Sequence, residues 1–71
     1  MLVDFEVGKT YYALFSGGSR EHFTVNGFET LGYLVKHVDV TWWDGTQELV
    51  EYDDIVRMVE DYNAKYGGQP G

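Results

Sequence analysis

The sequence predicts a β-rich α+β domain, namely a strongly bent antiparallel sheet or a small barrel of four to five strands with a C-terminal helix. Short runs of β-forming residues alternate with glycine-containing turns over residues 10–52, which is typical of antiparallel strands. Apolar residues recur at helical spacing over residues 53–66. Because this helix is terminal, no crossover helix is available for a parallel βαβ sheet.

Residues 10–15 and 20–25 predict a first hairpin, because both runs are rich in β-forming residues and flank a glycine-rich loop. Pairing across a two-residue Gly17–Gly18 turn sets Tyr12 opposite Phe23. The expected core side then holds Tyr12, Leu14, Phe23 and Val25, and the opposite side holds Tyr11, Ala13 and Phe15.

The segments on either side of this hairpin carry further signals. Val3, Phe5 and Val7 alternate with acidic residues, which predicts a first strand or an extended arm. Asn26–Gly27 is a turn signal, and residues 28–32 lengthen the connection to the next strand. We therefore expect a turn at this dipeptide and a less regular link after it.

Residues 33–43 and 46–52 predict a second hairpin around Asp44–Gly45. Asp-Gly between two β-rich runs is typical of a type I′ turn, in which both central residues have positive φ. This register sets Val40 opposite Leu49. One apolar side then holds Val38, Val40, Trp42 and Leu49. The other side also carries aromatic residues, so either the sheet curls until both faces are partly covered or one face is a binding surface.

The helix follows this hairpin almost without a linker. Asp53 is the expected N-cap, and Asp54 suits the positive end of the helix dipole. Gly67–Gly68 is the expected end of the helix. One apolar stripe holds Ile55, Met58, Val59, Tyr62 and Tyr66. We therefore expect a single domain over residues 1–66 and a flexible glycine-rich tail over residues 67–71.

Composition restricts the partners. Twelve acidic residues against five lysines and arginines leave a net charge of −7 on 71 residues. Such a charge argues against direct binding to nucleic acid or to anionic membranes, and it favours a basic protein partner. There is no cysteine, so stability comes from aromatic packing or oligomerisation rather than from disulfides. No signal peptide or membrane-spanning run is recognisable, and a cytoplasmic location is expected.

The sequence carries no pattern that predicts an enzyme. Gly8-Lys9-Thr10 resembles the end of a phosphate-binding loop, but that motif needs a glycine where Val3 stands, and a helix after it. The serines and two histidines do not form a recognisable triad with an orienting acid. The histidines and carboxylates match no metal-ligand spacing. We therefore expect no catalytic residue, metal or cofactor.

The tryptophan pair is a candidate binding feature. Neighbouring strand residues point to opposite faces, so Trp42 and Trp43 do not both enter one core. If Trp42 packs inside, Trp43 lies outside near carboxylates, where cation–π attraction and negative charge favour the same basic ligands. The alternative is that the helix or the first hairpin covers Trp43.

Acidic residues along the hairpin and the helix form a second candidate feature. A line of carboxylates imitates a line of phosphates, and small acidic proteins that mimic DNA use this arrangement against DNA-binding proteins. The alternative is a solvated acidic face that only keeps the chain soluble. The residues concerned include Asp44, Glu48, Glu51, Asp54 and Glu60.

Two fragments resemble SH3 domains and Tudor-type small barrels. Tyr12-Ala13-Leu14-Phe15 is similar to the Ala-Leu-Tyr segment of SH3 domains, and Trp42-Trp43-Asp44-Gly45 resembles their Trp-Trp pair before a turn. The resemblance implies an SH3-like barrel with a ligand groove lined by Tyr12, Phe15 and Trp42. The chain departs from the pattern at Ser16–Gly17 and in having a helix where SH3 domains have a proline–aromatic segment. The analogy turns Trp42 toward the ligand, whereas strand alternation turns it inward.

Three hypotheses follow. The first is a protein-interaction module that binds a basic or proline-containing segment. The second is an acidic, DNA-mimicking inhibitor of phage or mobile-element origin, and the third is a subunit of a larger assembly, including a homo-oligomer. The predicted partner-binding residues are Tyr11, Phe15, Trp42, Trp43, Asp44, Glu48, Glu51, Asp54 and Glu60.

Overall fold

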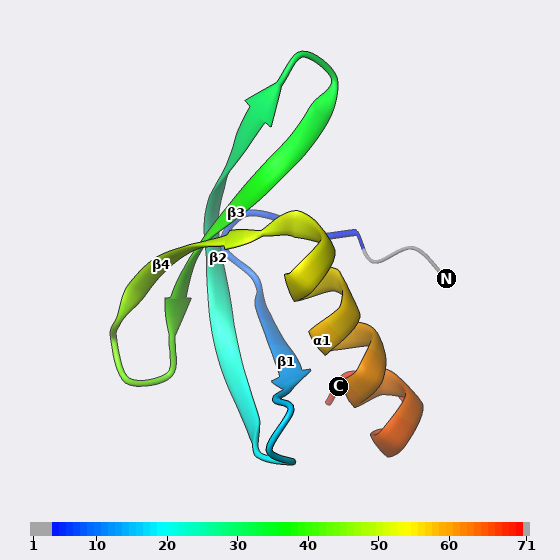
Figure 1. Cartoon of the computed structure of the whole chain (residues 1–71). Helices are drawn as coiled ribbons and strands as arrows, with labels where there is room; N and C mark the ends of the chain where they lie inside the picture. Colours follow the sequence, from blue (N-terminus) through cyan, green and yellow to red (C-terminus); the bar gives the residue numbers. More distant parts are fainter. Residues whose placement is uncertain (1–3, 71) are drawn as a thin grey trace.

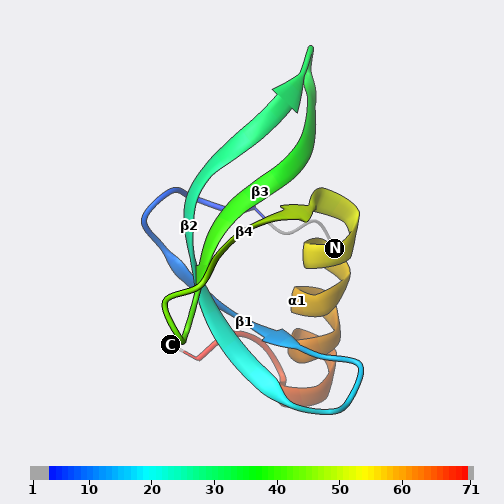
Figure 2. The same ribbon diagram turned by 60° about the vertical axis from the view of Figure 1, so that its left-hand side comes forward.

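A computed structural model describes residues 4–70 and shows one antiparallel sheet with one helix packed against it (Figure 1). The elements are β1 (Thr10–Leu14), β2 (Arg20–Leu31), β3 (Leu34–Trp42), β4 (Gln47–Glu51) and α1 (Tyr52–Tyr66). The strand order is β1-β2-β3-β4, and each strand pairs with the next one in sequence. This confirms the predicted β-rich α+β class with a C-terminal helix. The sheet is strongly twisted but not closed, so β1 and β4 are its edges (Figure 2).

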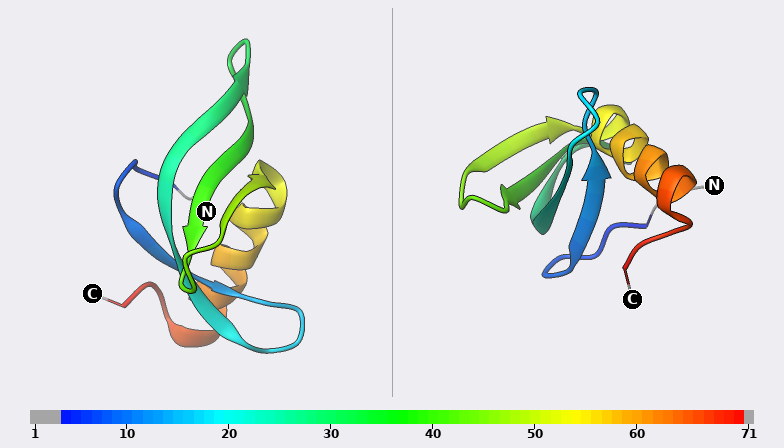
Figure 3. Two further views of the ribbon diagram at one scale, coloured as in Figure 1. Left: turned by 90° about the vertical axis from the view of Figure 1, so that its left-hand side faces the viewer. Right: turned by 90° about the horizontal axis from the view of Figure 1, so that it is seen from below.

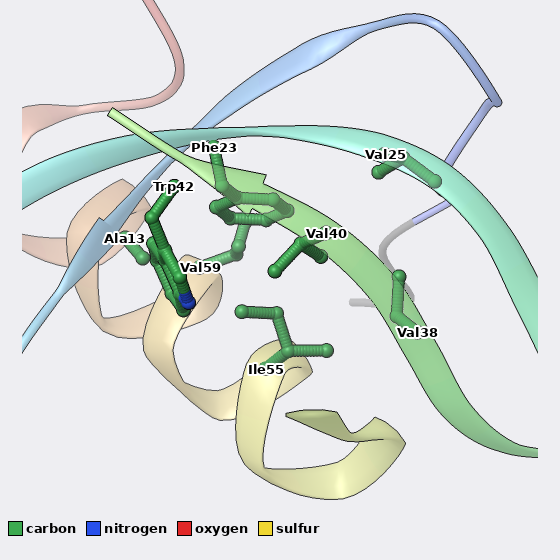
Figure 4. Packing of buried hydrophobic residues seen from close by; sticks show 8 residues of the cluster. All are labelled: Ala13, Phe23, Val25, Val38, Val40, Trp42, Ile55 and Val59. Carbon is green, nitrogen blue, oxygen red and sulfur yellow. The ribbon is translucent and has the colours of Figure 1, made fainter. Parts of the chain in front are cut away.

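The core lies between the sheet and α1, where strand side chains face Ile55 and Val59 of the helix (Figure 4). Phe23 and Trp42 meet edge to face in it, with ring centroids 5.3 Å apart. The buried cluster is Ala13, Phe23, Val25, Val38, Val40, Trp42, Ile55 and Val59. The helix buries Ile55, Val59 and Tyr62 of its predicted apolar stripe, because side chains three and four positions apart share one helix face. Met58 is partly buried, and Tyr66 at the end of the stripe is exposed. No helix within residues 4–70 has the length and apolar character needed to cross a membrane.

The hairpins β1–β2 and β3–β4 are closed by the same kind of loop. In the first, the Gly18 N–H donates to the Phe15 carbonyl at 2.8 Å, and the Phe15 N–H donates to the Ser19 carbonyl at 2.8 Å. In the second, the Gly45 N–H donates to the Trp42 carbonyl at 2.9 Å, and the Trp42 N–H donates to the Thr46 carbonyl at 2.8 Å. Each loop thus has three residues and ends in a glycine with positive φ, as in a turn followed by a G1 bulge.

This loop length makes both predicted registers wrong by one residue. Tyr11, not Tyr12, stands opposite Phe23, and Val40 stands opposite Glu48 rather than Leu49. A one-residue slip moves each side chain to the other face of the sheet. Tyr11, Ala13, Phe15 and Val50 therefore pack on or in the core, whereas Tyr12, Leu14 and Leu49 leave the core side. The predicted type I′ turn is also wrong, because no residue other than glycine has positive φ within residues 4–70.

The middle hairpin, β2–β3, corrects the predicted turn at Asn26–Gly27. β2 runs through this dipeptide with a bulge in its pairing, and the chain turns later, at Gly32–Tyr33. Gly32 has φ +60°, as the first position of a type II′ turn requires. The outer half of this hairpin projects beyond the rest of the molecule (Figure 1). Its tip exposes Leu31, Tyr33 and Leu34.

The two ends of α1 differ in how well the sequence predicts them. Glu51, not Asp53, is the N-cap, and it makes no side-chain capping bond. Asp53 lies in the first turn, where its charge still favours the helix dipole. The C-terminal end is as predicted, because Gly67 adopts the left-handed conformation and its N–H donates to the Asn63 carbonyl at 2.8 Å.

The N-terminal segment is not a strand in its described part. Val3 lies outside the described residues, and residues 4–7 pair with no strand. Phe5 packs against the core instead, edge to face with Tyr11 at 5.0 Å between ring centroids. Of the two predicted alternatives, a first strand is therefore wrong over residues 4–7, and this segment contributes an aromatic anchor instead.

Candidate binding groove

A groove of about 520 Å³, called the main groove here, lies between the β1–β2 loop, β4 and α1. Phe15 and Trp42 supply aromatic surface, and Val50 and Met58 supply aliphatic surface from β4 and α1. Its full lining is Leu14, Phe15, Ser16, Gly18, Trp42, Glu48, Val50, Asp54, Arg57, Met58 and Asp61. The main groove thus combines an apolar interior with charged side chains.

A smaller depression of about 210 Å³ shares Phe15, Trp42 and Glu48 with the main groove and adds Trp43 and Asp44. Its three aromatic rings meet close to edge on. Phe15 and Trp42 have ring centroids 5.3 Å apart at an interplanar angle of 66°, and Phe15 and Trp43 are 6.3 Å apart at 88°. The two tryptophans are 6.2 Å apart at 75°. The rings therefore form an aromatic corner at one end of the main groove.

The matching loops explain how Phe15 and Trp42 come together. Each residue stands directly before a three-residue loop and is held there by the backbone bonds that close the loop. β1 and β3 both pair with β2, and Phe23 of β2 lies opposite Trp42. The rings of Phe15 and Trp42 meet in the folded chain, although 27 positions separate them in sequence.

Hydrogen bonds orient Glu48, which lines the main groove, and Asp44, which lines the smaller depression. The Trp42 Nε1–H donates to Glu48 Oε1 at 2.8 Å, which connects the aromatic corner to β4. The Thr46 backbone N–H donates to Asp44 Oδ1 at 3.0 Å. This bond from Thr46 holds the pKa of Asp44 below its ordinary value, because a hydrogen bond to a carboxylate favours its charged form.

The helix side of the groove carries charges of both signs. Arg57 Nη2 lies 3.0 Å from Asp54 Oδ1, one helical turn apart. Both side chains remain largely accessible, so this ion pair contributes little to stability. With Glu48 and Asp61, the lining holds three carboxylates against one guanidinium. The groove is therefore negative overall.

Six predicted binding residues gather here. Trp42 is only 8% exposed and Trp43 is 47% exposed, so strand alternation correctly indicates which ring is buried. The remaining surface of Trp42 nevertheless lines the groove. The six residues are Phe15, Trp42, Trp43, Asp44, Glu48 and Asp54.

The other predicted residues lie elsewhere. The Tyr11 hydroxyl accepts from the Glu6 N–H at 2.8 Å, so this ring anchors the N-terminal segment. Tyr12 packs against Tyr62 of α1, away from the groove. Glu51 lines a separate depression of about 170 Å³ beside His37. Glu60 lies on α1 and lines neither the main groove nor its smaller depression.

Three α1 residues that line the main groove are not among the predicted binding residues. Arg57, Met58 and Asp61 line the main groove together with Asp54. Their spacing of three and four residues places them on one helix face, which is a signal that the sequence carries. The apolar stripe assigned Met58 to the core, and only the position of β4 shows that it also faces the groove.

Within residues 4–70, no three histidine, cysteine, aspartate or glutamate side chains form a group suited to a metal ion. Comparison with protein-family models, curated proteins and solved structures gives no match to this chain.

Proposed function

We propose that the chain is a small acidic protein-interaction module whose main groove binds a basic segment of a partner protein. The observation that carries the proposal is the meeting of an aromatic corner with carboxylates in the main groove and in the smaller depression that shares its lining. Phe15, Trp42 and Trp43 supply the rings, and Glu48 and Asp54 supply charge.

The chemistry of the groove suits lysine and arginine side chains. Their aliphatic stems pack on apolar surface while their charged ends reach carboxylates. A cation over an aromatic face contributes roughly 0.5–2 kcal/mol, depending on how far water is excluded. The net charge of −7 also attracts a basic partner over long distances and accelerates its association.

The SH3-like resemblance supports this proposal at two positions. Phe15 and Trp42 line the groove, as that analogy implies, whereas Tyr12 lies outside it. We propose that the twisted sheet corresponds to an open form of such a barrel, with α1 on the side where an SH3 domain has its proline–aromatic segment. On this basis proline-containing basic segments are suitable first ligands.

A library of labelled basic peptides, read by fluorescence anisotropy, tests the proposal. Trp43→Ala removes the exposed ring of the aromatic corner, and we expect it to weaken binding about tenfold or more. Leu34→Ala is the matched control, because Leu34 is also exposed but lies at the tip of the middle hairpin. Equal affinity of the wild type and Trp43→Ala would contradict the proposal, as would a library without any ligand.

The acidic-inhibitor hypothesis remains the second candidate, supported by the net charge. It requires the predicted carboxylates to act as one line, yet Glu48 and Asp54 line the main groove while Glu51 lines another depression. It predicts binding that DNA abolishes by competition and that Trp43→Ala leaves unchanged. Binding to peptides that depends on Trp43 favours the groove instead.

A further inference from the structure

The hydrogen-bond pattern of β3 and β4 shows which backbone groups of β4 face outward. The Trp42 N–H donates to the Thr46 carbonyl at 2.8 Å and the Trp42 carbonyl accepts from the Gly45 N–H at 2.9 Å, so both backbone groups of Trp42 point toward the β4 side. In an antiparallel ladder hydrogen-bonded pairs alternate with non-bonded ones. Glu48 and Val50 are therefore bonded to β3, and the residues between them direct their N–H and C=O groups away from the sheet.

Gln47 and Leu49 are the outward residues of this edge. Within residues 4–70, their backbone groups take part in no hydrogen bond. β4 begins at the outer edge of the sheet, far from α1 (Figure 3). A strand edge in this state is a template for another extended chain.

The free edge and the main groove adjoin each other. Glu48 and Val50 line the main groove with their side chains, while the residue between them, Leu49, offers its backbone at the edge. A chain that pairs with β4 would therefore direct every second side chain to the same face as Glu48 and Val50, which is the groove side.

We propose that the basic partner segment binds in an extended conformation as a fifth strand on the free edge of β4. This inference rests on the proposed function and adds the backbone recognition to it. Main-chain hydrogen bonds to Leu49 supply affinity that is independent of sequence, and alternate basic side chains supply specificity in the groove. The ligand pattern is thus basic residues at positions i and i+2, about 7 Å apart.

Charge complementarity identifies the occupant as a basic segment rather than a second copy of the chain. The groove lining holds three carboxylates and one guanidinium, and each copy carries a net charge of −7. Two such edges repel each other, whereas a segment rich in lysine or arginine neutralises the groove.

A single proline substitution at Leu49 tests whether the partner segment pairs with β4. The Leu49 N–H points to the free edge, so Leu49→Pro removes that donor and leaves the ladder with β3 intact, as edge prolines do. We expect Leu49→Pro to weaken binding of a groove-binding basic peptide about tenfold, the effect of one lost hydrogen bond. Leu49→Ala keeps the N–H and should bind like the wild type.

A second measurement keeps the native protein and alters the peptide. N-methylation of single peptide amides removes one donor at a time. We expect losses at alternate positions, in a two-residue period, because only every second amide of an added strand faces β4. Circular dichroism melting of Leu49→Pro checks that the variant is folded.

Each outcome decides a separate claim. If no basic peptide binds the wild type, the proposed function fails. If peptides bind and need Trp43, but Leu49→Pro and the methylation scan leave affinity unchanged, only the added strand is overturned. Concentration-dependent dimerisation that Leu49→Pro abolishes, with peptide binding unaffected, would assign this edge to a second copy and also overturn the proposal.

Discussion

The two edge strands of the sheet, β1 and β4, differ in whether their outward backbone groups have hydrogen-bond partners. On β1, the Tyr12 N–H donates to Gln69 Oε1 at 2.6 Å, and Gln69 Nε2 donates back to the Tyr12 carbonyl at 3.1 Å. Gln69 Nε2 also donates to Asn63 Oδ1 at 2.7 Å, which connects this contact to α1. On β4, Gln47 and Leu49 have no such partner within residues 4–70.

This difference shows that a side chain can satisfy the outward backbone groups of an edge strand. The side-chain amide of Gln69 carries a carbonyl acceptor and two N–H donors, so it pairs with both backbone groups of Tyr12, as one residue of a neighbouring strand would, and still donates to Asn63. Gln69 belongs to the predicted flexible tail, yet it is docked on β1. β4 is five residues long and mostly polar, which limits its tendency to aggregate although Gln47 and Leu49 have no backbone partner within residues 4–70.

The largest expected effect comes from removing the helix contact that covers β1. Tyr62 is buried and stacks on Tyr12 at 5.5 Å between ring centroids. Tyr62→Ala should lower the free energy of unfolding by about 3 kcal/mol, the range for large aromatic truncations. Leu49→Ala, at the open edge, should change it by less than about 0.5 kcal/mol. Urea denaturation measures both, and similar losses would show that the two edges do not differ.

Removing the Gln69 amide tests its role at the β1 edge, called the closed edge because Gln69 bonds to its backbone; the β4 edge is called the open edge. Gln69→Ala leaves the partly buried Tyr12 backbone groups unpaired, and we expect a loss of about 1–2 kcal/mol. Amide hydrogen exchange at Tyr12 should accelerate to resemble that at Leu49. Gln47→Ala, which alters a glutamine on the open edge, is the control and should leave the exchange of Tyr12 unchanged. Slow exchange at Tyr12 in Gln69→Ala would contradict this role.

The β1–β2 and β3–β4 loops have the same backbone conformation, so a glycine-to-alanine substitution should destabilise the protein equally in both. Gly18 and Gly45 have φ of +91° and +88°, and a Cβ at either position meets no atom within 4 Å. Alanine at each should therefore cost about 1 kcal/mol, from backbone strain alone. Thermal melting of Gly18→Ala and Gly45→Ala checks this, and clearly unequal losses would mean that the loops differ in more than sequence.

The smallest effect is the pH dependence at Asp44, which supports the loop before β4. Its folded pKa is lowered, so its stabilising contribution is present above the unfolded pKa and is lost as pH falls through the folded pKa. The stability difference between the wild type and Asp44→Ala should shrink over that acidic range. Asp44→Asn keeps an acceptor for Thr46 without the charge, so its difference from Asp44→Ala should not vary there.

The sequence by itself determined the kinds of elements and much of their content. Periodicity identified the helix and its buried stripe, and strand alternation turned Trp42 inward and Trp43 outward. These properties are local, because they follow from backbone geometry within a few residues.

The tertiary structure alone decided the strand registers, the groove and the closed edge. Because both outer hairpins have three-residue loops, their registers differ by one residue from the predicted ones, and Val50 rather than Leu49 faces α1. The groove joins a loop, a strand and a helix face that lie far apart in sequence, and Gln69 meets Tyr12 across 57 positions. Such contacts depend on how the whole chain packs around one core, which no local pattern contains.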